Sequence, residues 1–222
     1  MSYRKEFFTN GQIYHIYNKT IDHINIFNNH SLGDLFLDLL CYYRSQTIKL
    51  RYSRFLELEI KSKKKLIQQI KEPANFKIEI FAYILMPNHF HLLLKQKKTN
   101  GIVRFMSDTL NSFTRTHNSS CKRLGPIFLP KFKSKRISSE EQLIHTSRYI
   151  HLNPYSSGLI KNVKDLKNYQ FSSFKEYLNR PRLCYTQEIL ALFKEDEDSY
   201  NQFVLNNAEH QKTLEIVKHF SK

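Results

Sequence analysis

Long apolar segments are missing from this chain. No hydrophobic run reaches the roughly 18 residues that cross a membrane, and residues 1–6 lack the apolar stretch of a signal peptide. Cysteine is scarce: Cys41, Cys121 and Cys184 lie far apart and are odd in number. Their spacing argues against a disulfide framework or a cysteine zinc site. Internal repeats and low-complexity linkers are absent too. From the missing apolar segments and the scarce cysteines, we expect a cytoplasmic, nucleoid-associated protein with no membrane partner.

Acidic residues are also in short supply. Lys and Arg number 35 against 20 Asp and Glu, which gives a formal net charge of +15 on 222 residues. A hydrophobic content of 41% is enough to bury a core, so wholesale disorder is excluded. The excess charge predicts a polyanionic partner. Charge alone does not separate DNA, RNA and an anionic membrane.

The basic residues gather in four stretches: 61–65, 95–98, 115–123 and 131–136. The first reads as the solvated face of a helix. The last interleaves bases with Phe and Ser in a strand-like pattern, and alternation places Lys131, Lys133 and Lys135 on one strand face. We therefore expect these lysines, with Arg136 and with Arg115 from the third stretch, to contact nucleic acid.

The pattern of hydrophobic residues predicts the order of the elements. Strands are expected over 12–19, 77–85, 89–95 and 127–137. Helices are expected over 31–43, 53–70, 102–118 and 140–153, with the last ending before Pro154. The strand 77–85 is apolar nearly throughout, which suits burial on both faces. The order predicts an α+β, ferredoxin-like split β-α-β fold, an antiparallel sheet with helices packed on one face.

Beyond the sheet, the sequence turns to short helical pieces over 172–178, 186–193, 200–205 and 211–220. We interpret residues 1–178 as one catalytic or binding domain, and 179–222 as a helical C-terminal extension.

Two histidines stand in alternation at the start of the third expected strand. In His89-Phe90-His91 the two imidazoles point to the same side, while Phe90 points to the core. Two convergent imidazoles are a plausible half of a divalent-metal site. Taken alone, the spacing is weak, because two surface histidines at a hairpin start give the same pattern.

The helix 140–153 carries His145, Tyr149 and Asn153 at four-residue steps, so the three share one face. Asn153 offers an oxygen ligand, and Tyr149 offers a phenol that acts as a nucleophile beside a metal. On spacing alone, a core tyrosine with a hydrated hydroxyl is the commoner arrangement. Tyr155 and Tyr169 compete for the same role, but neither shares a helical face with Asn153.

Several blocks together resemble the single-tyrosine HUH transposases. They are Tyr-His-Ile-Tyr-Asn at 14–18, Ile-Leu-Met-Pro-Asn-His-Phe-His at 84–91, Gly-Pro-Ile-Phe at 125–128 and Tyr-Ile-His-Leu-Asn-Pro at 149–154. The similarity is strongest to the REP-associated tyrosine transposases and their insertion-sequence relatives, and it covers about residues 10–178 in order.

The resemblance implies a function for each matched residue. His89, His91 and the amide of Asn153 would bind Mg²⁺ or Mn²⁺, and Tyr149 would attack a phosphate of single-stranded or hairpin DNA. The product would be a 5′-phosphotyrosine and a free 3′-hydroxyl, which allows strands to be cleaved and rejoined. Relatives act as monomers or as homodimers, and both remain open here.

Two other functions are considered. His117-Asn118-Ser119 and His145-Thr146-Ser147 match the repeated motif of histidine phosphoesterases, but both lie on expected helices where that chemistry needs strands. A non-catalytic DNA- or RNA-binding protein derived from a transposase shares every feature except turnover.

Overall fold

A sheet of four strands forms the centre of the protein, whose computed structural model describes residues 7–178 and 181–220. The strands are β1 (Ile13–Lys19), β2 (Ile78–Met86), β3 (His89–Gln96) and β4 (Lys133–Ile137). They lie in the order β2-β3-β1-β4, with every neighbouring pair antiparallel. This is the sheet of the ferredoxin-like split βαβ arrangement. The α+β class expected from the sequence is confirmed.

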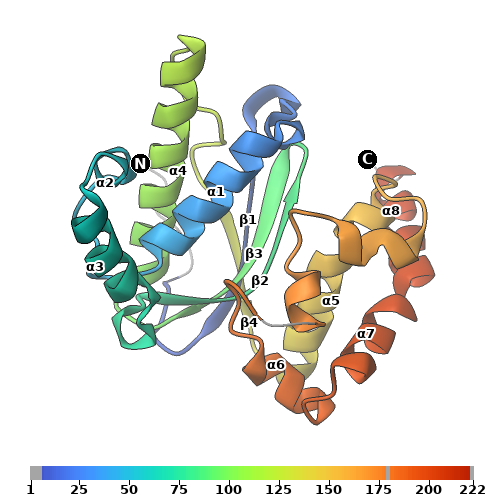
Figure 1. Ribbon diagram of the computed structural model, residues 1–222. Coiled ribbons are helices and arrows are strands. Elements are labelled where there is room, and N and C mark those ends of the chain that lie inside the picture. Colours follow the sequence, from blue (N-terminus) through green and yellow to red (C-terminus); the bar gives the residue numbers. More distant parts are fainter. Residues whose placement is uncertain (1–6, 179–180, 221–222) are drawn as a thin grey trace.

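Helices surround the sheet (Figure 1). They are α1 (His30–Tyr43), α2 (Tyr52–Leu56), α3 (Ile60–Lys71), α4 (Gly101–Cys121), α5 (Glu140–Ser156), α6 (Gln187–Leu190), α7 (Glu197–Leu205) and α8 (Ala208–Phe220). Short 3₁₀ segments are η1 (Ile21–His23), η2 (Ile26–Asn28), η3 (Pro73–Asn75), η4 (Val163–Asn168), η5 (Phe174–Tyr177) and η6 (Ala191–Phe193). None of the helices in the described ranges is both long and apolar enough to cross a membrane.

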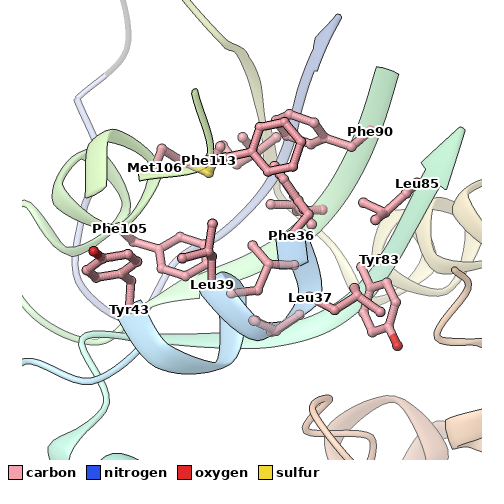
Figure 2. Packing of buried hydrophobic residues seen from close by; sticks show 14 of the residues in the cluster. Phe36, Leu37, Leu39, Tyr43, Tyr83, Leu85, Phe90, Phe105, Met106 and Phe113 are labelled. Atoms are coloured by element: carbon pink, nitrogen blue, oxygen red, sulfur yellow. The ribbon is translucent and has the colours of Figure 1, made fainter. Parts of the chain in front are cut away.

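The first face of the sheet is covered by α1 and α4, which also pack on each other. Figure 2 shows Phe36 of α1 and Phe113 of α4 pointing toward Phe90 of β3. The ring centroids of Phe36 lie 5.1 Å from Phe90 and 5.4 Å from Phe113, and all three side chains are fully buried. Close aromatic packing of this kind ties both helices to the middle of the sheet.

The second face of the sheet is covered as well. Helix α5 packs on β2 and β3, and α6, α7 and α8 complete this second core. The expectation that helices pack on one face holds for α1 and α4 only. The physical reason lies in β2, where Ile80 and Leu85 enter the first core while Phe81, Ile84 and Met86 enter the second. A strand that is apolar on both sides needs cover on both sides.

The expected end of the helix that carries Tyr149 and the expected start of the fourth strand are wrong. Helix α5 continues through Pro154 to Ser156, because Tyr155 is buried and backbone bonds to Asn153 and Tyr155 close the last turn. Strand β4 begins only at Lys133, since Pro130 has no N–H for a ladder, leaving Phe128 in an isolated bridge.

The expected helix 53–70 is divided into α2 and α3. By contrast, the hairpin expected between β2 and β3 is present, with a two-residue turn at Pro87 and Asn88.

A buried polar network ties α5 to the C-terminal helices. His151 of α5 has no exposed surface, and its Nε2 lies 2.8 Å from Ser173 Oγ while its Nδ1 lies 2.8 Å from Tyr200 Oη. Tyr200, on α7, also donates to Ser147 Oγ at 3.0 Å, and its ring stacks on Tyr177. Buried polar groups that are all bonded fix one arrangement of the elements that carry them. The network therefore holds α5 in one position on the sheet.

Tyr200→Phe should destabilise the protein, because it leaves the buried Nδ1 of His151 without its partner. We expect the free energy of unfolding to fall by about 1–3 kcal/mol, measured by urea denaturation. The matched control is Tyr185→Phe, whose side chain is 44% exposed and whose hydroxyl bonds to no described residue. That control should stay within about 0.5 kcal/mol of the parent. If the two variants had equal free energies of unfolding, the hydrogen bonds of Tyr200 would not contribute to holding α5 in place.

Candidate functional site

The side chains of His89 and His91 converge on the face of β3 that α5 covers. Phe90 and Leu92 alternate with them and enter the first core, whereas Leu93 enters the second. The two imidazole centroids lie 5.2 Å apart with their planes nearly perpendicular. The convergence expected from the alternation is therefore present at the start of β3.

Each of these imidazoles already has a partner at Nδ1. His89 Nδ1 lies 2.8 Å from Asn88 Oδ1, so this nitrogen carries the proton and Nε2 is left as an acceptor. His91 Nδ1 lies 2.9 Å from Nε2 of His15, which comes from β1. When His91 donates in this pair, its Nε2 also becomes available to a metal. Histidines that ligate metals are oriented in this way by a partner on the other nitrogen.

Burial keeps the cluster neutral. Desolvation lowers the pKa of His15 and of His89 to about 4, with the nearby charge of Lys135 adding to the effect at His15. The same cause lowers the pKa of His91 well below its ordinary value, and His91 is only 7% exposed. A neutral imidazole is the form that binds a divalent cation.

Tyr149 of α5 lies against the histidines. Its ring meets His91 edge-on at a centroid distance of 5.7 Å, and it meets His15 at 6.0 Å. On the other side, Tyr17 of β1 stacks on His91 at 5.6 Å. The structure therefore brings the expected nucleophile and one of the expected ligands into direct contact within one chain.

Asn153 lies one turn further along α5, and it is 7% exposed. Its Nδ2 donates to the backbone carbonyl of Tyr149 at 2.9 Å, and Gln211 of α8 donates to the same carbonyl at 3.1 Å. Within the described residues, no hydrogen bond joins Asn153 to either histidine, and its Oδ1 accepts none. The amide oxygen is thus unengaged, and Asn153 makes no hydrogen bond to either imidazole.

The described part of the chain holds no group of three or more His, Cys, Asp or Glu side chains arranged to bind a metal. The two histidines are therefore short of a third ligand of these types. The negative charge of Glu215 on α8 acts on His89, where it opposes the burial that lowers the pKa of this imidazole. The side chains that fit a cation here are two imidazoles and an amide oxygen.

The basic residues expected to contact nucleic acid divide between two sides of the protein. Lys131 and Lys133 line a pocket of about 380 Å³ together with His89 and His91, and Lys135 lies opposite His15 in the β1–β4 register.

Arg136 lies one residue out of phase with Lys135 and binds Gln12 through its guanidinium. Arg115 is on α4, across the sheet from Tyr149. The three lysines share the side of the histidines, and the two arginines do not.

His15 and Tyr17 belong to the site, although sequence reasoning did not assign them a role. Two signals pointed to them: they lie in the block 14–18 that resembles the transposases, and the alternation of β1 places both on the same face. Strand register decides the rest, because the pairing of His15 with Leu93 and of Tyr17 with His91 brings the rings together. No sequence pattern indicated that Gln211 contacts the site, since it lies in the C-terminal extension, outside the matched motifs.

The two motifs that match histidine phosphoesterases do not come together in one site. His117 lies on α4 and His145 lies on α5. These helices cover opposite faces of the sheet, so the two motifs do not share a site.

A family model described as "Transposase IS200 like" matches residues 40–153, slightly more than half of the chain. The matched range contains His89, His91, Tyr149 and Asn153. The chain belongs to the IS200-like transposase family. The family expected from the histidine and tyrosine motifs is thereby confirmed, and with it a role in DNA transposition. No curated protein matches this transposase.

Two solved structures resemble the transposase. One, described as the structure of a REP-associated tyrosine transposase bound to a REP hairpin, aligns with a TM-score of 0.55 at 17% identity. It covers 81% of this chain and 87% of that chain, which shows a shared fold. The other, a putative transposase from Deinococcus radiodurans R1, has a TM-score of 0.34 at 14% identity, over 66% of this chain and 93% of that chain. At that score it carries no argument.

The buried imidazoles should lower the stability of the folded transposase in mild acid. The folded-state pKa is about 4 for His15 and His89 and about 3 for His151, all below the ordinary value of 6.5. Below pH 6.5 the unfolded chain therefore binds more protons than the folded chain, so the free energy of unfolding falls as pH falls. We expect a lower urea midpoint at pH 5.5 than at pH 7, measured with chelator present. Identical midpoints would mean that the folded protein accepts protons at these sites.

Proposed function

We propose that this transposase cleaves and rejoins single-stranded DNA, next to hairpins, with Tyr149 as the nucleophile. The observation that carries the proposal is the contact of the Tyr149 ring with His91, beside two imidazoles that are each bonded through Nδ1. The same contact supports an active site completed within one chain, whether the transposase acts as a monomer or as a homodimer.

The site fits a divalent cation. The neutral imidazoles, each with a partner at Nδ1, suit a transition-metal ion such as Mn²⁺ better than Mg²⁺, whereas the unengaged amide oxygen of Asn153 suits either ion. The residues that would hold the cation are His89 and His91 through Nε2, and Asn153 through Oδ1. When bound, such a cation polarises the scissile phosphate and stabilises the negative charge on the leaving oxygen.

The protein's own residues supply the remaining chemistry. The Tyr149 oxygen attacks phosphorus, so that an O–P bond forms and the bond from phosphorus to the 3′-oxygen breaks. The phenolic proton is lost, and the leaving oxygen takes up a proton as a 3′-hydroxyl. Lys133 and Lys135 place positive charge near the reacting phosphate. Because the phosphotyrosine conserves the bond energy, the 3′-hydroxyl of another strand can reverse the reaction without ATP.

The DNA substrate is proposed from two features. The pocket beside the histidines combines Lys131 and Lys133 with the rings of Tyr17, His89 and His91. Positive charge beside the half-buried rings of Tyr17 and His89 suits a single strand, whose backbone is attracted and whose bases stack. The hairpin is proposed because the structurally similar REP-associated transposase is described as bound to a REP hairpin.

Tyr149→Phe should abolish the covalent adduct while leaving DNA binding intact, because it removes only the attacking oxygen. The test is to incubate the transposase with labelled single-stranded DNA and Mg²⁺, and to map the modified peptide by mass spectrometry. The matched control is Tyr155→Phe, on the same helix, whose hydroxyl bonds to Glu209. This control should retain the adduct. An adduct on another residue, or one that survives in Tyr149→Phe, would overturn the assignment.

His89→Ala and His91→Ala should each abolish cleavage and weaken Mn²⁺ binding, because each removes one nitrogen ligand. We expect Mn²⁺ to activate cleavage better than Mg²⁺, since imidazole ligands favour it. Metal binding is measured by calorimetry, independently of activity. His145→Ala is the matched control on α5, because this exposed imidazole bonds to Arg148 and lies outside the cluster. Full cleavage in excess chelator would contradict a metal-dependent mechanism.

These experiments also test the alternative of a non-catalytic DNA- or RNA-binding protein derived from a transposase. Such a protein would bind nucleic acid equally in all variants and would form no adduct in any of them.

A further inference from the structure

A further histidine lies in the segment that follows β1, beside the two histidines of the site. His23 is the last residue of η1, and it lines the pocket of about 380 Å³ together with His89 and His91. Tyr149 does not line this pocket. It lines a separate pocket of about 190 Å³, bordered by α5 and α8.

Electrostatic effects order these groups in space. Burial is the main cause that lowers the pKa of His89, and the positive charge of His23 adds to it. At His91, burial is joined by the charges of His15 and His89, but not by that of His23. The Tyr149 ring contacts His91. His23 and Tyr149 therefore lie at opposite ends of the histidine pair, with His23 beside His89 and Tyr149 beside His91.

The backbone at His23 has an uncommon conformation. Asp22 and His23 both have positive φ, of 54° and 55°. Residues with a side chain rarely adopt this left-handed region, and Asp and His are among the types found there most often. Such positions persist only where the surrounding structure fixes them, and they cluster at functional sites.

The loop that carries His23 is fixed at both ends. The hydroxyl and the backbone N–H of Thr20 both lie within hydrogen-bonding distance of the Asn88 carbonyl, at 3.1 and 2.8 Å. The backbone N–H of Phe27 donates to the Pro87 carbonyl at 3.0 Å. These two carbonyls belong to the turn that directly precedes His89. The loop between the two anchors is consequently held beside the start of β3.

The side chain of His23 is available for chemistry. Within the residues that the structure describes, its exposed imidazole makes no hydrogen bond, ion pair or ring contact. The charged groups around it are Lys19, Lys131 and Lys133, which also line the pocket, and Asp22, its neighbour in the chain. No acidic side chain is among the described residues that line the pocket. Imidazole is the side chain that most readily both gives and takes a proton near neutral pH.

The cleavage step needs a proton donor on this side of the site. In an in-line displacement, the attacking oxygen and the leaving oxygen lie on opposite sides of phosphorus. Tyr149 attacks from the end of the pair at His91, so the 3′-oxygen departs toward the end at His89. That end opens into the pocket lined by His23. Proton transfer to a leaving oxygen in the transition state speeds such a step.

We propose that His23 is a further catalytic residue, which donates the proton that the leaving 3′-oxygen takes up. As the Tyr149 oxygen bonds to phosphorus, the bond from phosphorus to the 3′-oxygen breaks, and a proton passes from the His23 imidazolium to that oxygen. The phenolic proton of Tyr149 is released to water. When strands are rejoined, the neutral imidazole accepts the proton of the attacking 3′-hydroxyl, because the reverse step follows the same path. The inference rests on the proposed function, since it assigns a residue to the same reaction.

The test compares two single-stranded DNA substrates that differ in one atom. In the second substrate, sulfur replaces the 3′-oxygen at the cleavage site. A thiolate leaves without a proton, because the pKa of a thiol is only about 8.5. The variant is His23→Asn, which removes the acid but keeps a residue type that tolerates positive φ.

Formation of the Tyr149 adduct is measured in single-turnover experiments with Mn²⁺. With the oxygen substrate, His23→Asn should slow it by about 100-fold or more, the usual contribution of a general acid. With the sulfur substrate, the variant should react near the rate of the parent. The difference between the two substrates is decisive, because a purely structural role for His23 would slow both equally.

Two control variants lie close to His23. Asn25→Ala changes an exposed residue of the same loop that does not line the pocket, and it should leave both rates unchanged. Lys19→Gln removes a positive charge from the pocket itself. It should slow both substrates to the same extent, since attraction of the DNA backbone does not depend on the leaving atom.

Equal losses of His23→Asn on the two substrates, or full activity on both, would overturn the inference. Rescue of Lys19→Gln by sulfur, without rescue of His23→Asn, would assign the proton to Lys19 instead. Failure of the proposed function gives a different result. If the parent forms no Tyr149 adduct on either substrate, the cleavage mechanism is rejected and this inference with it. If the parent forms the adduct and His23→Asn behaves like the parent, this inference alone is rejected.

Discussion

The alternation of side chains along β3 is the constraint on which the rest of the structure depends. Phe90 and Leu92 must enter the core beneath α1 and α4, so His89 and His91 are forced to the opposite face. A shift of one residue in register would bury both imidazoles among phenylalanines and expose the core. The chemistry of the site is therefore protected by the same hydrophobic packing that stabilises the sheet.

The C-terminal helices complete the site as well as the core. Tyr200 of α7 bonds to His151, and Gln211 of α8 bonds to the carbonyl of Tyr149, so both helices act on the helix that carries the nucleophile. Burial lowers the pKa of His89 and His91, and the charge of Glu215 on α8 opposes this effect at His89. The neutral form of the histidines depends on burial, because a histidine in water is protonated at mildly acidic pH.

The basic residues divide between the two sides of the sheet. On the α5 side, Lys131 and Lys133 line a pocket with the half-buried rings of Tyr17 and His89. On the α4 side, Arg51 and Arg115 line a groove that also contains several hydroxyl groups. A basic excess spread along the chain thus resolves into two surfaces of different composition, and this distinction appears only when the residues are sorted by face.

The sequence by itself determined the order of elements, the side on which His89 and His91 lie, and the helix of Tyr149, because these follow from periods of two and of about 3.6 residues. Tertiary structure alone decided that α5 continues through Pro154 and that helices cover both faces. It also decided that His15 and Tyr17 reach His91, since strand register sets that contact. The physical reason is separation along the chain: contacts between residues many positions apart leave no local period to read, whereas alternation within a strand does.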